Sequence, residues 1–240
     1  MRRRTLLFAL VALVVAAVCV RLGFWQLARL RERRAVNAVV ASRLRLPAAT
    51  TLAALPADTA QARFRRVRLR GRYDYAHEVR LTGRSRNGSP GVNVITPLRL
   101  PDTSVAVLVN RGWVYSPNGA DADLSRWREG DSATVVGFVN TLSAGRSGVR
   151  SAGSSRGDVR WIDADAFARE AGYPVTCFTV VQQGDSAPAG SPRADSVPAR
   201  LDVPPLDEGP HMGYAFQWFA FAAIAVGGLA IVARTARDDH

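Results

Sequence analysis

A histidine followed by aromatic and amide side chains opens the last apolar stretch of the chain. This stretch begins His211-Met212-Gly213-Tyr214-Ala215-Phe216-Gln217-Trp218. No charged residue lies between Tyr214 and Ala233, and a helix of that length would be about 30 Å long, the thickness of a bilayer's hydrocarbon core. His211 would then lie at the lipid–water boundary, where amphipathic aromatic residues are also common. A neutral imidazole nitrogen at this boundary could ligate a metal ion or a haem iron.

Position alone also explains His211. Residues just outside a membrane-spanning helix are often polar because they are hydrated, and one histidine does not define a set of ligands. From the residues alone, a hydrated helix start is therefore the simpler interpretation, and metal or haem ligation is the more specific one.

A second apolar run, Thr5 to Val20, follows three arginines at the N-terminus. A basic start before an apolar run is the form of a secretion signal and also of an uncleaved anchor. No small residue occupies the last position before Arg21, so cleavage is disfavoured. The run becomes long enough to span a membrane if it continues past Arg21, whose charged head can snorkel, to Trp25. We expect a retained anchor that lies beside the second helix. Small residues would allow close approach, namely Ala9, Ala12 and Ala16 on one helix and Gly227 and Gly228 on the other.

The charges that flank the second apolar run predict the orientation. Arg234 and Arg237 follow it, whereas Asp207 and Glu208 precede it. The positive-inside rule places the C-terminus in the cytoplasm, and two spans then place the N-terminus there as well. Residues 29–210 would lie outside the cytoplasm.

The region between the two apolar runs changes to a period of two. From Arg66 to Tyr73, arginines at every second position alternate with Val67, Leu69 and Tyr73. This pattern predicts a half-buried strand. Its arginine face (Arg66, Arg68, Arg70 and Arg72) is either an anion-binding surface or an ordinary solvated face, which is the commoner case in antiparallel sheets.

Further strands are predicted along the middle region. They cover 78–82, 92–96, 105–114, 134–140 and 177–182, with a turn at Asn87-Gly88-Ser89-Pro90. The strand at 105–114 is interrupted by Asn110-Arg111-Gly112. A buried Arg111 would need a carboxylate or backbone carbonyls as partners, and Gly112 suggests a bulge. One short helix should begin after Asp163 and end at Gly172.

These elements predict a membrane α+β protein. Two transmembrane helices would flank a mainly antiparallel extracytoplasmic domain, a twisted sheet or partly closed barrel with one or two short helices. The expected divisions are a first transmembrane helix at 5–28, a juxtamembrane helix and linker at 29–60, the β-rich domain at 61–183, a Pro-rich tether at 184–210, a second transmembrane helix at 211–233, and a cytoplasmic tail at 234–240. Within the β-rich domain, the Gly/Ser-rich stretch from Ser143 to Gly157 would be a loop.

Composition narrows the function. The 240 residues carry a formal net charge of +12 that comes entirely from arginine, but no nucleic-acid motif frames these arginines. Anionic lipid headgroups are better counter-charges, and a nucleic-acid partner is not expected. The two cysteines form no Cys-x-x-Cys motif, which disfavours a thiol oxidoreductase or a copper relay. No nucleophile with a base, carboxylate pair or metal cluster is evident, and the other histidines are His77, at an expected hydrated strand junction, and the C-terminal His240. We therefore expect no enzyme and no catalytic residues.

Three blocks of the sequence carry distinctive motifs. The first is Leu22-Gly23-Phe24-Trp25-Gln26-Leu27 with Arg29, and the second is Val107-Leu108-Val109-Asn110-Arg111-Gly112-Trp113-Val114, led by Gly91 to Leu98. The third is His211 with Tyr214, Ala215, Gln217, Trp218 and Phe219. These blocks resemble those of the Surfeit-locus-one family and occur in that family's order and spacing, so the resemblance covers nearly the whole chain. Met212-Gly213 departs from the pair that is more usual after the histidine.

The resemblance implies an assembly factor for a haem-copper terminal oxidase, here in a bacterial plasma membrane. It implies that the chain binds haem a and passes it to the oxidase's catalytic subunit. His211 would ligate the haem iron, Trp218 and Phe221 would shield the porphyrin, and Arg21 and Arg29 are candidate partners for the propionates. The alternative is a scaffold that docks oxidase subunits through its extracytoplasmic sheet and binds no haem.

Overall fold

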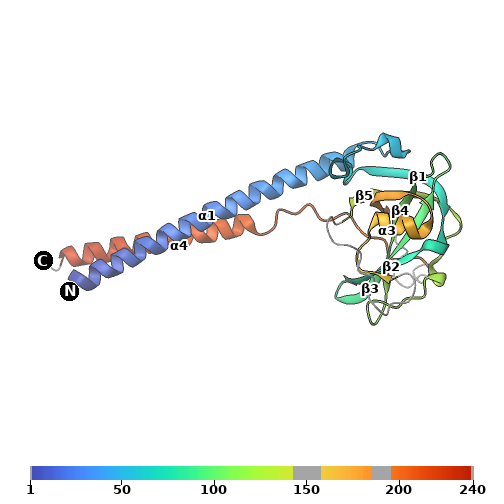
Figure 1. The fold of residues 1–240 in the computed structure, drawn as a ribbon. Helices are drawn as coiled ribbons and strands as arrows, with labels where there is room; N and C mark the ends of the chain where they lie inside the picture. The colour runs from blue at the N-terminus through green and yellow to red at the C-terminus, as the bar shows by residue number, and fades with distance from the viewer. Residues whose placement is uncertain (1, 143–157, 185–195, 239–240) are drawn as a thin grey trace. The chain divides into compact units, whose positions relative to one another are not determined.

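A computed structural model describes residues 2–142, 158–184 and 196–238 and divides the chain into two compact units (Figure 1). The first unit contains residues 1–41 and 205–240, and the second contains residues 42–204. The predicted loop at 143–157, part of the predicted tether (185–195) and His240 lie outside the described residues.

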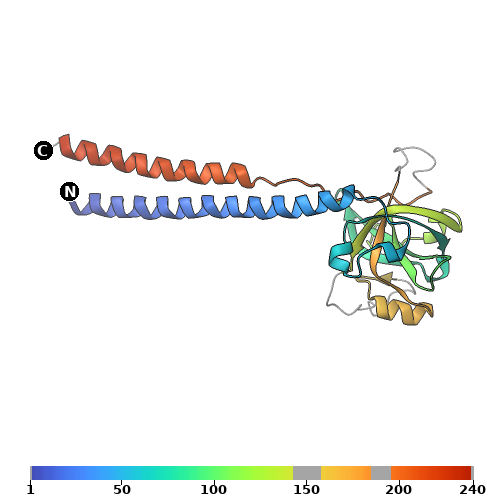
Figure 2. The ribbon, with the colours of Figure 1, turned by 90° about the horizontal axis from the view of Figure 1, so that it is seen from above.

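The first unit is a pair of long helices. Helix α1 (Arg2–Arg45) and helix α4 (His211–Asp238) run side by side in both ribbon views (Figure 2). Both are long and apolar enough to span a membrane. Large apolar side chains such as Phe216 and Ile224 are exposed on them, as expected for surfaces that face lipid. The helix expected after the first apolar run is part of α1, which continues without a break to Arg45.

The two helices of this unit pack along seams of small residues. The less exposed positions recur every three or four residues, which is the spacing of a coiled-coil seam. On α1 they are Ala9, Ala12, Ala16, Cys19, Gly23, Gln26 and Leu30, and on α4 they are His211, Ala215, Trp218, Ala222, Ala225 and Leu229.

The expectation that Gly227 and Gly228 allow the helices to approach closely was wrong. A Cβ atom built on Gly227 or Gly228 would meet no atom within 4 Å, whereas one on Gly23 would lie 2.6 Å from Cε1 of Phe219. The close approach therefore occurs near the start of α4, where the Phe219 ring lies over the backbone of Gly23.

The second unit is a five-stranded barrel with two added strands. The barrel consists of β1 (Arg66–Tyr73), β5 (Ser132–Thr141), β7 (Val175–Gln183), β4 (Ala106–Tyr115) and β3 (Ser89–Arg99), each paired with the next. It closes because β3 also pairs with β1, at Arg72↔Arg99 and Tyr73↔Leu98. Strand β2 (Val79–Arg86) pairs with β3, and the two-residue β6 (Asp158–Val159) pairs with β2. Only β4–β7 and β2–β6 are parallel among these pairs, so the predicted mainly antiparallel barrel is confirmed.

The barrel core follows from the period of two in the strands. Along β1, exposed and buried positions alternate without exception, with Val67, Leu69 and Tyr73 inside and the four arginines outside. The inner residues join Val107, Val109, Val135, Val139 and Val180 in one apolar cluster. The β2–β3 hairpin turns at Asn87 and Gly88, both with positive φ, so Ser89 and Pro90 belong to β3 rather than to the turn.

Short helices fill the connections. Helix α2 (Thr59–Ala62) is capped by Asp58, and helix α3 (Ala164–Ala171) is capped by Asp163 and ends at Gly172 in the left-handed conformation, as predicted. Three single turns of 3-10 helix also occur: η1 (Leu52–Ala54), η2 (Tyr75–His77) and η3 (Leu124–Trp127). His77 is not simply hydrated, because its Nδ1 lies 2.9 Å from the Asp74 carboxylate.

Candidate functional site

His211 is the first residue of α4 and lies on the seam with α1. Its Nδ1 atom is 2.8 Å from Oε1 of Gln26, a side chain that is only 9% exposed. A carboxamide oxygen only accepts hydrogen bonds, so with the amide oriented this way Nδ1 carries the ring proton. In the neutral ring with that tautomer, the lone pair is on the other nitrogen, Nε2.

The imidazole borders a surface depression within the helix unit. A Cβ atom built on Gly209 would lie 3.6 Å from Nε2, so the nitrogen faces a residue without a side chain. The depression has a volume of about 320 Å³ and is lined by Arg29, Glu32, Arg33, Val36, Asp207, Gly209 and His211. Two arginines, two carboxylates and one imidazole therefore share one polar opening.

The segment just before α4 is fixed to α1 by charged contacts. Arg34 donates two hydrogen bonds to the Glu208 carboxylate, at 2.7 and 2.8 Å, and Asn37 donates one to the Asp207 carbonyl oxygen. The hydrogen bonds from Arg34 lower the pKa of Glu208 below its ordinary value. These contacts are half-exposed and individually weak, but together they orient the chain that leads into His211.

The structure brings only some of the expected site residues together. His211 and Arg29 line the same depression, where Arg29 also pairs with Glu32 at 2.7 Å. Trp218 packs between the helices and makes an edge contact with the exposed Phe221, and neither is among the lining residues. Arg21 borders a different, apolar opening with Leu22, Phe24 and Trp25.

Some residues around the depression match the polar contacts that a haem makes. Iron-ligating histidines usually hold their second ring nitrogen against an oxygen acceptor, and Nδ1 of His211 lies against Oε1 of Gln26. Arg29 and Arg33 carry donors of the kind that suit propionates, but each already faces a carboxylate, Glu32 at 2.7 Å and Asp207 at 3.9 Å. The expected shielding by Trp218 and Phe221 is not part of this arrangement.

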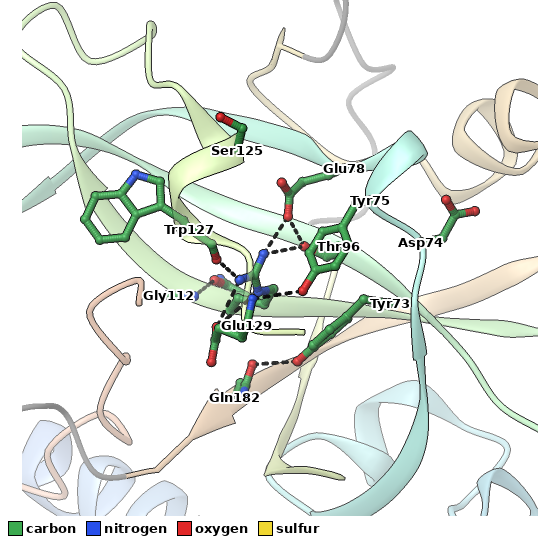
Figure 3. A network of polar contacts seen from close by, with 12 residues as sticks. Tyr73, Asp74, Tyr75, Glu78, Thr96, Gly112, Ser125, Trp127, Glu129 and Gln182 are labelled. Atoms are coloured by element: carbon green, nitrogen blue, oxygen red, sulfur yellow. Dashed lines mark hydrogen bonds and ion pairs between the residues drawn. The ribbon is translucent and has the colours of Figure 1, made fainter. Parts of the chain in front are cut away.

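A second polar centre lies in the barrel unit and is built around Arg111. Figure 3 shows this centre with its partners Glu78, Trp127 and Glu129 labelled. The register of β3 and β4 shifts between Val94 and Ile95, so Arg111 is the extra residue of a bulge and its side chain turns inward. Its guanidinium is 0% exposed. It donates to Glu78 at 2.7 Å, to Glu129 at 3.0 Å and to the Trp127 carbonyl oxygen. The prediction that a buried Arg111 takes carboxylates or carbonyls as partners is confirmed.

Charge in this centre is balanced by a second arginine. Arg200 donates to both oxygens of Glu129 and to the Arg111 carbonyl oxygen. Burial raises the pKa of Glu78 above its ordinary value, although hydrogen bonds from Thr96 and the Arg111 charge oppose this. Two arginines thus face two glutamates, and all four side chains are largely buried.

The prediction of an extended tether over 184–210 was wrong for its middle part, which this centre holds against the barrel. The Trp113 and Ala199 backbones exchange two hydrogen bonds of 2.8 Å. Gly112 allows this approach, since a Cβ atom there would lie 2.4 Å from the Ala199 carbonyl oxygen. The chain around Ala199 and Arg200 is therefore part of the barrel.

Sequence reasoning missed several residues of these centres, among them Arg33 and Glu78. Gln26 was noted only as part of a sequence block, and its partner lies 185 residues away. Glu129 and Arg200 carried no local signal, because each is one charged residue in an irregular segment. The available clue was Arg111 itself, whose burial in an apolar strand required opposite charge from elsewhere.

Comparisons with known proteins assign the family. A family model described as the SURF1 family matches residues 13–223, a range that contains Gln26, Arg111 and His211. Surfeit locus protein 1 of Takifugu rubripes is 25% identical over 227 residues, which cover 88% of this chain and 90% of that protein. The protein of the same name from Mus musculus is 24% identical, over 88% of this chain and 71% of its own length. A SURF1-like protein of Rickettsia felis is 31% identical over 45% of this chain and 47% of its own. Because the family match spans most of the chain, including both helices and the barrel, this protein belongs to the SURF1 family.

Proposed function

We propose that this chain is an assembly factor for a haem-copper terminal oxidase, and that it binds haem a at His211 and passes it to the catalytic subunit. One observation supports the haem site most directly. Nε2 of His211, whose other ring nitrogen contacts Gln26, lies beside a depression that is also lined by Arg29 and Arg33. Membership of the SURF1 family supports the oxidase as the partner.

Each residue of the depression has a role in this proposal. Nε2 of His211 ligates the iron, and Gln26 holds the ring through Nδ1. Arg29 and Arg33 bind the propionates by charge-assisted hydrogen bonds. A single protein ligand and an open depression suit a haem that must be released again, because the cargo is held by few contacts.

The proposal also includes a location. Both apolar helices remain in a bacterial plasma membrane, with both termini in the cytoplasm and the barrel outside it. The arginines that follow the second span and the acidic residues that precede it support this orientation. Cysteine accessibility on intact cells would test it, with the exposed Cys177 as the reporter of the barrel.

The haem site is tested by absorption spectroscopy of the full chain purified from cells that make haem a. We expect a Soret band that is lost in His211→Ala and in His211→Gln. Gln217→Ala is the matched control, since Gln217 is an exposed polar residue of the same helix. An unchanged Soret band in His211→Ala would remove His211 as the ligand.

The transfer step needs its own measurement. We expect the Soret band to move from the purified protein to the haem-free catalytic subunit when the two are mixed in detergent. Retention of haem by this chain under those conditions would argue against delivery.

A scaffold function is supported by a different observation. Arg66, Arg68 and Arg70 form an exposed row on β1 and make no ion pair with any described residue. If the chain only docks oxidase subunits, a triple Arg→Gln variant of this row should lose co-purification with them, while His211→Ala should keep oxidase assembly intact.

A further inference from the structure

Gln26 is the buried hydrogen-bonding partner of the imidazole at the end of the helix pair. It occupies a seam position of α1 between Gly23 and Leu30, where a polar side chain needs a partner. Its Oε1 atom lies 2.8 Å from Nδ1 of His211. A buried glutamine on an otherwise apolar seam is placed to set how the histidine is protonated.

We propose that Gln26 is a positioning residue that keeps the proton of His211 on Nδ1 and so presents Nε2 as the iron ligand. With the amide oriented as in the structure, the other tautomer would place a lone pair on Nδ1 against the carbonyl oxygen of Gln26, which is repulsive. A rotated amide would present its NH2 group to Nδ1 and favour that other tautomer, so the proposal includes the orientation of the amide. This inference rests on the proposed function for its consequence, haem ligation, but the tautomer itself is a property of the protein without haem.

The packing of the helices explains why Gln26 reaches His211. The Phe219 ring lies over Gly23 and makes an edge contact with Phe24, with ring centroids 5.3 Å apart. Cys19 meets Ala222 one turn further along. Because α1 residues of rising number meet α4 residues of falling number, this register brings Gln26 opposite His211. Two sequence blocks at opposite ends of the chain therefore build one site.

A neutral acceptor has a specific effect on a ligated imidazole. A hydrogen bond from Nδ1–H to an oxygen increases the electron density at Nε2 and strengthens its bond to iron, and a carboxylate does so more strongly than an amide. Glutamine therefore gives an oriented ligand of intermediate strength, which suits a site that binds haem and later releases it.

The tautomer is tested first in the haem-free full chain. Nitrogen-15 NMR of the histidines in detergent micelles, above the pH at which imidazole is protonated, distinguishes Nδ1–H from Nε2–H. We expect Nδ1–H at His211 in the wild type and a mixture of tautomers in Gln26→Leu. Gln217→Leu is the control and should leave the His211 signals unchanged. A wild-type His211 with the proton on Nε2 would overturn the inference whatever the haem result.

Haem titration then tests the consequence. Gln26→Leu should weaken haem affinity about ten- to a hundredfold, the usual range for loss of a partner to a metal-ligating residue. Gln26→Glu should restore affinity and lower the midpoint potential of the bound haem relative to wild type, which a merely structural role would not do. Equal affinity in Gln26→Leu and wild type, or an unchanged potential in Gln26→Glu, would contradict the role of Gln26.

The two proposals fail in different ways. If His211→Ala binds haem normally, the proposed haem site is wrong, but the NMR result still decides the tautomer. Loss of helix pairing in Gln26→Leu would appear as a reduced disulfide yield between Cys19 and an Ala222→Cys substitution, two positions in the same buried cluster. If Gln26→Leu loses helix pairing, the comparison of Gln26→Glu with the wild type still tests the role of Gln26.

Discussion

Arg111 is a buried charge whose partners come from several segments of the barrel unit. Its buried guanidinium is matched by Glu78 and Glu129, and Glu129 is shared with Arg200. The rings of Tyr73 and Tyr75 lie over the same guanidinium, each with its centroid 5.3 Å away. Removing one member of such a buried network leaves an uncompensated charge, whereas the intact network is close to neutral in its effect on stability.

Glu129→Gln should therefore destabilise the barrel strongly. The change keeps the shape of the side chain but leaves Arg111 and Arg200 with one carboxylate fewer, and we expect a loss of about 3–5 kcal/mol in the free energy of unfolding. Denaturant unfolding of the full chain in detergent, followed by near-ultraviolet circular dichroism, measures it. Asp131→Asn, which breaks the exposed Arg72–Asp131 pair, is the control and should cost less than about 1 kcal/mol.

Tyr73 makes the barrel sensitive to alkaline pH. Burial, followed by the nearby charge of Glu129, raises the pKa of the Tyr73 hydroxyl, against smaller opposite effects of Arg111 and Arg200. The folded state then holds this proton more tightly than the unfolded chain. The free energy of unfolding is therefore unaffected by Tyr73 ionisation below the ordinary pKa of about 10, and it decreases as the pH rises above that value.

Tyr73→Phe should make the free energy of unfolding less dependent on alkaline pH. The variant gives up the hydrogen bond to Gln182, at a cost of about 1 kcal/mol at neutral pH. Between about pH 8 and pH 11 its unfolding free energy should decrease less than that of the wild type. The reason is that the wild-type phenol ionises in the unfolded chain but keeps its proton in the folded state, and the variant lacks this phenol. Parallel pH dependences in the two proteins would show that Tyr73 is not the group responsible.

At the scale of elements, the helix pair depends on where small residues lie. Gly23 and Gly227 are both helical glycines in apolar stretches, yet only Gly23 has an atom of the other helix near its Cα. Composition alone cannot separate them, because it does not give the register between two helices.

Gly23→Leu should separate the helices where Gly227→Leu does not. The new side chain would overlap the Phe219 ring, whereas at Gly227 it would extend into open space. Oxidative cross-linking of Cys19 to an Ala222→Cys substitution, with Cys177 replaced by Ser, reports the pairing. We expect a several-fold lower yield in Gly23→Leu. Equal yields in the two leucine variants would indicate a different register.

The β4 bulge offers a matched test within the barrel. Gly112 has a φ of 132° and Gly130 a φ of 96°, so alanine is strained at both, by about 1–3 kcal/mol. Only at Gly112 would the added Cβ atom also collide with backbone, at the Ala199 carbonyl oxygen. Gly112→Ala should therefore cost more and should speed tryptic cleavage after Arg200, while Gly130→Ala should leave that cleavage slow.

For the whole molecule, the sequence predicts what local patterns determine. The alternation of β1, the two apolar helices and the cap at Asp163 all depend on neighbouring residues, and the structure confirms them. Contacts between segments that are distant in the sequence could not be predicted. The closure of β3 on β1 and the contact of Gln26 with His211 depend on how complete elements pack, and no short pattern encodes that.

The last prediction concerns how far the two units depend on each other. They are separately compact, and mutations at distant sites without shared partners usually have additive effects. Gly112→Ala should lower the melting temperature of the barrel by about 2–4 °C for each kcal/mol lost and leave the cross-link between Cys19 and Ala222→Cys unchanged. Gly23→Leu should do the reverse.

Thermal melts and cross-linking of both single variants and the double variant measure this directly. Residues on both sides of the division between the units belong to one helix, α1, which runs from Arg2 to Arg45. If Gly23→Leu also lowers the melting temperature of the barrel, this helix transmits the change. If the effects are additive, the two units are independent in stability.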